Sequence, residues 1–387
     1  MFILVINCGS SSAKYQLFDV KKHAVLAKGI IERIGQDQSA LRHEKTDGSA
    51  LSKKVSCPDH YVAINIIVEI LTDPRHGVIS SPDQIEGIGH RVVHGGEEFK
   101  YSTLITKKVI ASIEKYSELA PLHNPPSLLG IKACTRALPG IPQVAVFDTS
   151  FHQTMPPTSF LYGLPFEYYK KYGVRKYGFH GTSHRFVAAK AAEILKRPLS
   201  KLRLITCHLG NGCSMTAVNK GKSVDTSMGF TPLEGLLMGT RSGDLDPAVV
   251  FYLMEKEQLS PSRISDILNK ESGLLGISGV SNDMRDILKR SKGKAQEAKR
   301  CRLAIEIFIY RIKKYIGAYQ AAMGGLDAVI FTAGISEHNP WLVRRIGKEL
   351  KGIAARRTRF MVVPTNEELL IAKDTYGIIT EENDAKS

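Results

Sequence analysis

Two segments far apart in this chain share one pattern, and this repeat constrains the fold more than any other feature. The first is Ile3-Leu-Val-Ile-Asn-Cys-Gly-Ser-Ser-Ser-Ala-Lys14, and the second is Leu204-Ile-Thr-Cys-His-Leu-Gly-Asn-Gly-Cys-Ser214. Aligning Asn7 with His208 also aligns Gly9 with Gly210. Each segment reads as an apolar strand, a turn of small residues and a second strand. Rossmann and Walker loops place a helix after the glycine turn, so neither motif is present. The repeat predicts two similar domains.

The composition of the two turns suits phosphate. A turn between strands can direct successive backbone N–H groups at an anion. Asn7, Ser10, Ser12 and Lys14 surround the first turn, and Lys14 could reach a phosphate as a point charge. A tight hairpin alone would also explain the small residues. The second copy favours phosphate binding, with a nucleotide held between two domains, and this indicates a phosphotransferase.

Length and composition limit the class of protein. A chain of 387 residues exceeds a usual domain, which again predicts two domains. No apolar run is long enough to span a bilayer, and the apolar start lacks the basic region of a signal peptide. The six cysteines form no C-x-x-C pair. We therefore expect a cytoplasmic protein with reduced thiols and no membrane partner.

The formal net charge is +15 and the pI is about 9.4, with one dense basic stretch between Arg285 and Arg302. A nucleic-acid-binding protein would more often show a basic stripe interleaved with exposed aromatic residues. We therefore expect a solvated helical face and attraction of anionic substrates, with no nucleic-acid partner.

The apolar pattern alternates between strand and helix periods, which predicts α/β domains. Strands are predicted over residues 2–7, 14–20, 24–33, 85–92, 143–148, 203–208, 214–218, 223–226 and 327–332. Helices are predicted near residues 60–72, 107–118, 182–196, 246–256, 262–269, 284–291, 297–322 and 340–353. Residues 303–322 are apolar around much of the helix, so we expect them in a core or a subunit interface. The pattern is interrupted within residues 149–165, where we place the domain boundary.

Two polar positions follow predicted strands of the first half. Arg91 lies in Gly89-His-Arg-Val-Val-His-Gly-Gly96, where its guanidinium could bind a carboxylate or phosphate through two hydrogen bonds. His90 and His94 have a metal-like spacing, but no third ligand is evident, so a metal there is not favoured. Asp148 ends an apolar strand, where α/β proteins bind ligands, although a turn or cap role would also explain it.

Two further candidates lie in the second half. His180 lies in an aromatic and glycine-rich loop, and we expect Thr182 or Ser183 to cap the helix that follows. Arg241 lies within Gly239-Thr-Arg-Ser-Gly-Asp244, a flexible frame that neither a buried strand nor a helix requires. That composition favours a ligand-binding role for the arginine.

Together these motifs resemble the acetate and propionate kinase family, within the larger group of actin, hexokinase and the heat-shock ATPases. The resemblance covers essentially the whole chain. It includes Asn7-Cys-Gly-Ser-Ser-Ser-Ala-Lys, His90-Arg-Val-Val-His-Gly-Gly, Pro121-Leu-His-Asn-Pro-Pro, Val146-Phe-Asp-Thr-Ser-Phe-His, Tyr177-Gly-Phe-His-Gly-Thr-Ser-His, His208-Leu-Gly-Asn-Gly, Gly239-Thr-Arg-Ser-Gly-Asp, Phe331-Thr-Ala-Gly-Ile-Ser-Glu and Asn366-Glu-Glu-Leu. Each motif is moderately specific, and in this order they are highly specific.

The resemblance implies an α/β fold of two duplicated actin-like ATPase domains, of the ribonuclease H-like type, with a nucleotide cleft between them. The implied domains are residues 1–149 and 150–387, with a segment from about 367 to 387 returning to the first. The second domain would bind the nucleotide and form a homodimer. The implied reaction is reversible, Mg²⁺-dependent transfer of the ATP γ-phosphoryl group to acetate, giving acetyl phosphate and ADP. Mn²⁺ is expected to substitute for Mg²⁺.

The resemblance also assigns roles to residues of this chain. Arg91 and Arg241 would flank the acyl substrate and the phosphoryl group, Asp148 would be the acidic active-site residue, and His180 would stabilise the transition state. Asn7 and Glu367 would hold the metal, with Glu368 leaving a one-position ambiguity, and His123 would lie near the site. A small apolar pocket for the acyl methyl group would consist of Val93, Leu122, Phe179 and Pro232. The nucleotide would contact Lys14, His208, Leu209, Gly210, Asn211, Gly212, Asp283, Met284, Arg285, Phe331, Thr332, Ala333, Gly334 and Ile335.

Elementary chemistry refines two of these roles. Acetate is already ionised at neutral pH, so a base has no proton to remove, and in-line transfer depends mainly on positioning and charge neutralisation. We therefore expect Asp148 to position Mg²⁺ or an arginine. The resemblance also implies that Val93 narrows the acyl pocket relative to propionate-preferring relatives, and one methylene is worth only ~1–3 kcal/mol in such discrimination. Propionate is therefore expected to be a poorer substrate and not an excluded one.

Three alternatives share part of this pattern. A propionate kinase would differ only in pocket size. A nonenzymatic actin-like or chaperone-like ATPase would share the two hairpins but has no need for Arg91, Arg241 and the Val93 pocket. A sugar kinase would need a true base and a polar substrate pocket.

Overall fold

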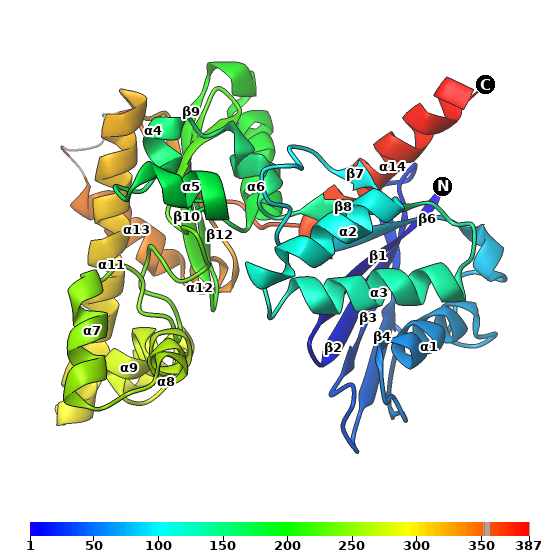
Figure 1. The fold of residues 1–387 in the computed structure, drawn as a ribbon, viewed down its shortest axis with the longest axis horizontal. Coiled ribbons are helices and arrows are strands. Elements are labelled where there is room, and N and C mark those ends of the chain that lie inside the picture. The colour runs from blue at the N-terminus through cyan, green and yellow to red at the C-terminus, as the bar shows by residue number, and fades with distance from the viewer. Residues whose placement is uncertain (351, 353–356, 387) are drawn as a thin grey trace. The chain divides into compact units, whose positions relative to one another are not determined.

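The computed structural model describes residues 1–350, 352 and 357–386. The end of the helix predicted over 340–353 and the last residue of the predicted C-terminal segment lie outside these described residues. The chain forms two compact units. Unit 1 comprises residues 1–151 together with the segment from Asn366 onward, and unit 2 comprises His152–Thr365 (Figure 1).

Unit 1 is built on a mixed sheet with the strand order β5-β4-β3-β2-β1-β6-β8-β7. The five strands β1 to β5 form an antiparallel meander, and β6 and β8 run parallel to β1 on its other side. The bounds are β1 (Phe2–Gly9), β2 (Ser12–Asp19), β3 (Ala24–Glu32), β4 (Ala40–Lys45), β5 (Ala50–Lys54), β6 (Ile85–Val92), β7 (Thr103–Leu104) and β8 (Gln143–Phe147).

Helices cover both faces of β1, which explains why its residues Phe2–Ile6 are all apolar. Leu4 and Ile6 belong to a buried cluster with side chains of α1 (His60–Thr72) and α3 (Asn124–Ala137). Ile3 and Val5 belong to another cluster, with Ile371 of α14 (Glu367–Lys386). Helix α2 (Lys107–Lys115) completes the unit. Helix α14 therefore contributes to the core of unit 1.

Unit 2 contains a five-stranded sheet in the order β11-β10-β9-β12-β13. Strands β9, β10 and β11 form an antiparallel meander, and β12 and β13 continue parallel to β9. The same order and directions occur in β3-β2-β1-β6-β8 of unit 1. The bounds are β9 (Arg203–Leu209), β10 (Cys213–Asn219), β11 (Lys222–Thr226), β12 (Ala328–Thr332) and β13 (Arg359–Val362). The predicted α/β class with a duplicated core is confirmed.

The helices of unit 2 lie on the two faces of this sheet and beyond one end of it. Figure 1 shows α6 (Gly181–Leu195) and α11 (Gln296–Met323) on opposite faces. Phe308, Ile312 and Ile316 of α11 are fully buried, as the apolar pattern of that helix predicted. The other helices are α4 (Pro157–Phe160), α5 (Phe166–Tyr172), α7 (Pro247–Lys256), α8 (Pro261–Asp266), a π-helical turn (Ile267–Glu271), α9 (Gly273–Ser278), α10 (Met284–Arg290), α12 (Gly334–Glu337) and α13 (Pro340–Glu349).

One local prediction is wrong. Helix α6 begins at Gly181, so Thr182 and Ser183 lie inside its first turn and neither is the N-cap. His180 occupies the N-cap position with left-handed backbone angles (φ 55°, ψ 24°) and makes no side-chain capping bond. The Ser183 hydroxyl instead donates to Thr365 Oγ1 at 2.9 Å and contacts His208 Nδ1 at 2.8 Å. Tertiary partners therefore use the hydroxyl that a local cap would need.

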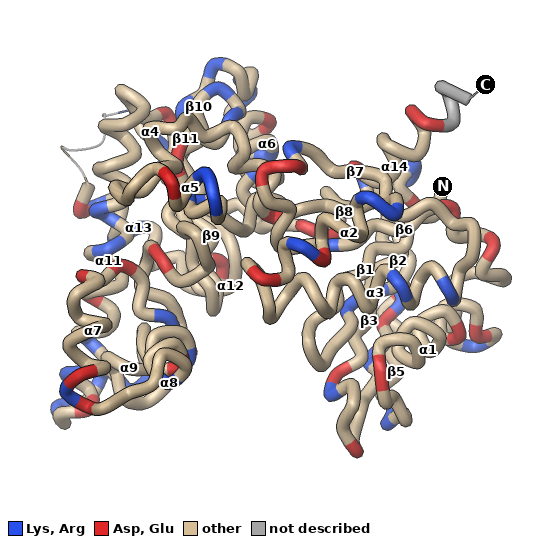
Figure 2. Tube along the Cα trace, in the orientation of Figure 1, with Lys and Arg blue, Asp and Glu red and all other residues tan. Residues whose placement is uncertain are grey.

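Among the described residues, Lys and Arg are not confined to one element or to one unit. Figure 2 shows Lys and Arg spread over many elements of both units and interspersed with Asp and Glu. In the dense stretch, Arg290 pairs with Glu297 at 3.0 Å, Arg300 donates to Ile277 O, and Arg302 donates to Ser291 O. These arginines close local turns and helix ends. Among the described residues, no helix is long and apolar enough to cross a membrane.

Candidate functional site

The first group of candidate residues lies at the end of the β1–β2 hairpin in unit 1. Asn7 and Lys14 are directly opposite in the strand register, so their side chains lie on the same face of the sheet. His60 Nε2 lies 2.8 Å from the carbonyl oxygen of Gly9 and braces the turn from α1. The hairpin therefore presents one amide and one ammonium group side by side.

A buried ion pair joins the carboxyl ends of two parallel strands in the same unit. Arg91 Nη2 donates to Asp148 Oδ2 at 2.6 Å, and Arg91 Nε donates to Asp148 Oδ1 at 3.2 Å. The Asp148 side chain is 2% exposed. This carboxylate is the main cause of a raised pKa of Arg91. The guanidinium is therefore held charged and in a fixed orientation by a bidentate contact.

A second carboxylate approaches the same arginine from α14. Glu367 Oε2 lies 3.8 Å from Arg91 Nε. Burial raises the pKa of Glu367, and the positive charge of Arg91 partly opposes that shift. The neighbouring Glu368 instead lines a separate groove with Asn7 and Lys14. Of the two glutamates, Glu367 is the one in contact with Arg91.

Arg91 also lines a small cavity of about 180 Å³. Its lining includes five candidates, Asn7, Lys14, Arg91, Val93 and His123, together with Cys8, Gly9, Ser12 and Ser127. Leu122 is not part of this lining, and its side chain is 69% exposed. The structure thus brings most of the candidates of unit 1 together and leaves one apart.

Asn124 supports this cavity, a role that was not predicted for it. Its side chain accepts from the backbone N–H of His94 at 3.0 Å and donates to the carbonyl of His94 at 2.9 Å. This two-point contact fixes the loop that follows β6 and carries Val93. The one feature of the sequence that pointed to Asn124 was its place in the Pro121–Pro126 motif.

In unit 2, the candidates gather around the β9–β10 hairpin. The rings of His180 and His208 stack with centroids 4.2 Å apart. A Cβ atom built on Gly212 would lie 3.4 Å from His180 Cε1 and 3.4 Å from Arg241 Nη1. Glycine at this position therefore leaves both functional groups accessible beside the turn.

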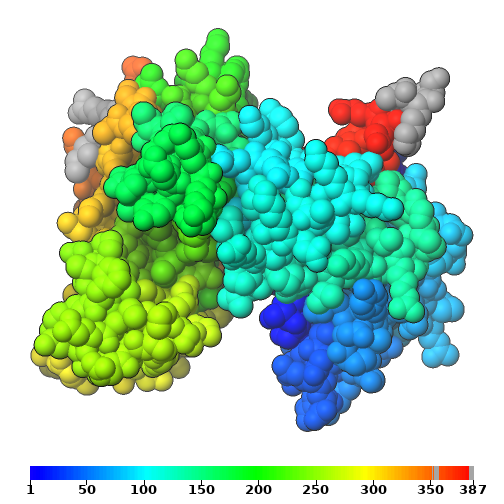
Figure 3. Space-filling view, in the orientation of Figure 1, coloured from blue at the N-terminus to red at the C-terminus, as the bar shows by residue number. Residues whose placement is uncertain are grey.

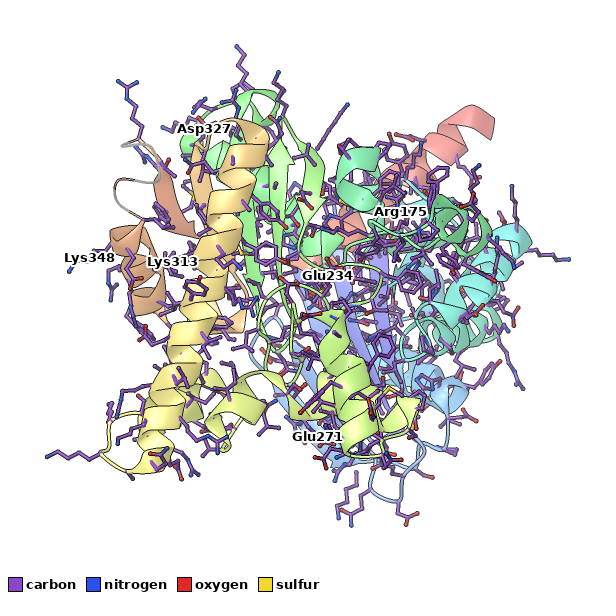
Figure 4. The ribbon with its side chains drawn as sticks, turned by 60° about the vertical axis from the view of Figure 1, so that its left-hand side comes forward. Arg175, Glu234, Glu271, Lys313, Asp327 and Lys348 are labelled. Atoms are coloured by element: carbon purple, nitrogen blue, oxygen red, sulfur yellow. The ribbon has the colours of Figure 1, made fainter. Side chains whose placement is uncertain are left out.

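The loop between β11 and α7 carries Pro232 and Arg241, and its own contacts hold it in place. Arg241 Nη1 donates to the carbonyl oxygen of Pro232 at 3.2 Å. Burial lowers the pKa of Arg241. The Tyr162 hydroxyl accepts from the N–H of Phe230 at 2.8 Å and donates to Glu234, which is labelled in Figure 4. The loop thus presents a cationic side chain from a fixed backbone.

A larger cavity of about 390 Å³ lies at the ends of β9 and β12 in unit 2. Seven of its lining residues were predicted to bind the nucleotide: Gly210, Asn211, Asp283, Met284, Arg285, Gly334 and Ile335. Asn282, His338 and Asn339 also line it and were not predicted. Leu209, Phe331 and Thr332 are fully buried in the strands behind the cavity, so they support the lining without belonging to it.

The backbone at the edge of this cavity is strained. Ala333 has φ 66° and ψ 170°, a region that residues other than glycine rarely adopt. Glu337 Oε1 accepts from the N–H of Ala333 at 2.7 Å and holds this conformation. On the other side, Asp283 caps α10 through the N–H of Arg285 and pairs with its guanidinium at 2.6 Å. Strain of this kind is typical of ligand-binding turns.

The oxygen donors of unit 1 suit a hard divalent cation. Among the described residues, no group of three His, Cys, Asp or Glu side chains could hold a metal ion by itself. Mg²⁺ commonly binds through one or two carboxylates together with water and substrate phosphates, and the amide of Asn7 and the carboxylate of Glu367 fit that pattern. His90 is occupied otherwise, since its Nε2 lies 2.7 Å from Gln143 Oε1.

Comparison with known proteins places these observations in a family. The model of the acetokinase family matches residues 2–356. An acetate kinase of Halothermothrix orenii is 53% identical over 98% of this chain and 100% of its own length. The crystal structure of Porphyromonas gingivalis acetate kinase superposes with a TM-score of 0.91 at 45% identity, covering 98% of this chain and 99% of that one. A propionate kinase from Francisella tularensis superposes with a TM-score of 0.90 at 39% identity, covering 97% and 99%. The chain belongs to the acetokinase family.

Proposed function

We propose that this protein transfers the γ-phosphoryl group of ATP to acetate, reversibly, giving ADP and acetyl phosphate. The observation that carries the proposal is the Arg91–Asp148 pair beside a cavity of about 180 Å³ lined by Val93. A fixed guanidinium next to a small, partly apolar space suits a short carboxylate. The name of the Halothermothrix orenii relative supports the same substrate.

The chemistry needs no base. An acetate oxygen attacks the γ-phosphorus, the bond from that phosphorus to the β,γ-bridging oxygen breaks, and ADP leaves with the electron pair. No proton moves, because acetate is already ionised at neutral pH. Arg91 would orient the carboxylate, and Asp148 would hold Arg91 through its two hydrogen bonds. This supports a positioning role for Asp148 over a role as general base.

Unit 2 would supply the groups that meet negative charge on the transferring phosphoryl group. His180 and Arg241 lie beside the same glycine, Gly212, and the backbone carbonyl of Pro232 restrains the arginine. Preorganised donors of this kind stabilise the equatorial oxygens in the transition state. The cavity lined by Asn211, Asp283 and Gly334 would hold the nucleotide.

Asn7 and Glu367 would hold Mg²⁺, and Mn²⁺ would be accepted in its place because both prefer oxygen ligands. When bound, the ion would neutralise phosphate charge and orient the ATP tail. Lys14, opposite Asn7 in the hairpin, would place a further positive charge beside the phosphates.

The six cysteines are all buried and unpaired, which supports a reducing compartment such as the cytoplasm.

Propionate is the second candidate substrate, because a propionate kinase is structurally similar over nearly the whole chain. Val93 argues against it as the preferred acid, since this side chain takes up part of the cavity beside Arg91. The preference for acetate over propionate would be modest, because the two acids differ by one methylene group, which is worth only ~1–3 kcal/mol in such a pocket.

A homodimer would form through unit 2. Helix α7 contains no buried residue, and Phe251 and Tyr252 are 71% and 59% exposed. Figure 3 shows the yellow-green segment that contains α7 at the surface. Large aromatic side chains exposed on one helix are typical of interfaces, where aromatic residues are enriched.

The first prediction concerns the reaction itself. With Mg²⁺-ATP and hydroxylamine as a trap, the protein should form hydroxamate from acetate, less from propionate and least from butyrate. The order follows from the size of the cavity lined by Val93. ATP hydrolysis without hydroxamate from any of the acids would contradict the proposal and favour an ATPase of the same fold.

The second prediction concerns Asp148→Asn. The substitution removes the charge that fixes Arg91 and should lower kcat/KM for acetate by about 10- to 100-fold, since a hydrogen bond between charged groups is worth ~1.5–3 kcal/mol. Steady-state kinetics at several Mg²⁺ concentrations measure the effect. Asp73→Asn, which alters a surface turn of the same unit, is the control. Near-normal turnover with normal Mg²⁺ dependence would show that the role assigned to Asp148 is wrong.

The third prediction concerns acid selectivity. Val93→Ala enlarges the cavity and should raise the propionate-to-acetate ratio of kcat/KM by roughly 5-fold or more. Val92→Ala is a matched control, because Val92 is fully buried in the core and does not line the cavity. That control should lower stability and leave the ratio unchanged. The pocket assignment fails if both variants keep the ratio of the parent protein.

The fourth prediction concerns the oligomer. The protein should sediment as a dimer, and Phe251→Glu should weaken the dimer by about 30-fold or more if Phe251 is a central contact worth ~2 kcal/mol. Tyr101→Glu serves as the control, because Tyr101 is 77% exposed but belongs to unit 1. Analytical ultracentrifugation over a concentration series separates the outcomes. A dimer unaffected by Phe251→Glu would place the interface elsewhere.

A further inference from the structure

A buried row of polar side chains runs from His180 into the core of unit 2. Ser214 Oγ lies 2.9 Å from His180 Nδ1 and 2.7 Å from His184 Nε2. The other ring nitrogen of His184, Nδ1, lies 2.7 Å from Thr206 Oγ1. Ser214, His184 and Thr206 are all 0% exposed. Three side chains from β9, β10 and α6 therefore connect His180 to the interior.

The hydrogens in this row can be arranged in few ways. A serine hydroxyl has one hydrogen, so Ser214 must donate to one of its two histidines and accept from the other. Burial lowers the pKa of His184 well below its usual value, so that ring is neutral, with one N–H donor and one acceptor nitrogen. Once the donor and acceptor are known for the hydrogen bond at one end of the row, they are therefore known for every hydrogen bond in it.

Thr206 determines the direction in which these hydrogen bonds are donated. Among hydrogen bonds between described residues, its hydroxyl has His184 Nδ1 as its one partner. If His184 Nδ1 carried the hydrogen, the Thr206 hydroxyl hydrogen would be buried without an acceptor, which is unfavourable. Thr206 therefore donates to Nδ1, His184 Nε2–H donates to Ser214, and Ser214 donates to His180 Nδ1.

We propose that Thr206, His184 and Ser214 are positioning residues that hold His180 in one tautomer, with its hydrogen on Nε2. The Nε2 edge of this ring faces the hairpin turn, since a Cβ atom on Gly212 would lie 3.6 Å from it. The Nε2–H of a neutral His180 ring then lies beside the same glycine as Arg241. Its use on a phosphoryl oxygen rests on the proposed function, whereas the tautomer does not.

The tautomer can be measured directly. In full-length protein labelled with ¹⁵N-histidine, long-range ¹H–¹⁵N spectra distinguish protonated from unprotonated ring nitrogens, and His180→Gln assigns the His180 signals. We expect Nε2 of His180 to be protonated and Nδ1 to be an acceptor in the protein without substrates. A His180 hydrogen on Nδ1 would overturn the proposal.

Two threonines on the neighbouring strands β9 and β10 provide a matched pair of variants. Thr206 and Thr216 are directly opposite in the β9–β10 register, and both are fully buried. Among the hydrogen bonds of the described residues, the Thr216 hydroxyl is joined to Thr226 Oγ1 at 3.0 Å and to no member of the histidine row. Thr206→Val and Thr216→Val therefore remove the same group at neighbouring places, and only the first interrupts the row.

Thr206→Val and Ser214→Ala should give His180 signals of mixed tautomers and lower kcat by about 3- to 10-fold with little change in KM for ATP, as expected for loss of one supporting hydrogen bond. Thr216→Val should keep the spectrum and kcat of the parent. Equal spectra and equal kcat for the two valine variants would overturn the proposal. If the parent protein shows the expected tautomer but forms no acyl phosphate, the proposed function fails and the tautomer assignment stands.

Discussion

The ion pair between Arg91 and Asp148 is the interaction on which the geometry of unit 1 depends. It forms because β6 and β8 are parallel neighbours, so the residues at their carboxyl ends meet at one edge of the sheet. A buried carboxylate in two hydrogen bonds leaves the guanidinium few alternative positions. The loop that carries Val93 and the start of α14 then close around the same arginine.

Unit 2 surrounds its hairpin turn with a different set of groups. The same strand order places this turn next to the end of β12, where hydroxyl and imidazole groups form hydrogen bonds beside the turn. The charged side chains of this region are Arg241 beside Gly212 and the Asp283–Arg285 pair in the lining of the cavity. His180 has a left-handed backbone, so its conformation depends on its neighbours. The two copies of the fold therefore carry different polar groups at corresponding turns.

The strands and their duplication could be read from the sequence because central strands are apolar on both faces and the turns have a distinctive composition. Helix α3 was missed, since Pro125 and Pro126 suggest a turn although proline is favoured in the first turn of a helix. The exposure of Leu122 and the first turn of α6 depend on tertiary contacts, which no local pattern reports. The row through Ser214 and Thr206 was invisible for a similar reason, because ordinary strand residues become partners only through the register of β9 and β10 and the position of α6.

Helix α14 has a consequence for biosynthesis. It packs against Ile3 and Val5 and brings Glu367 to Arg91, yet the ribosome adds it after all of unit 2. Strand β1 is therefore synthesised well before the helix that covers its second face. During translation this apolar face remains exposed while unit 2 can already fold, so unit 1 is the part of the nascent chain that most needs protection from aggregation.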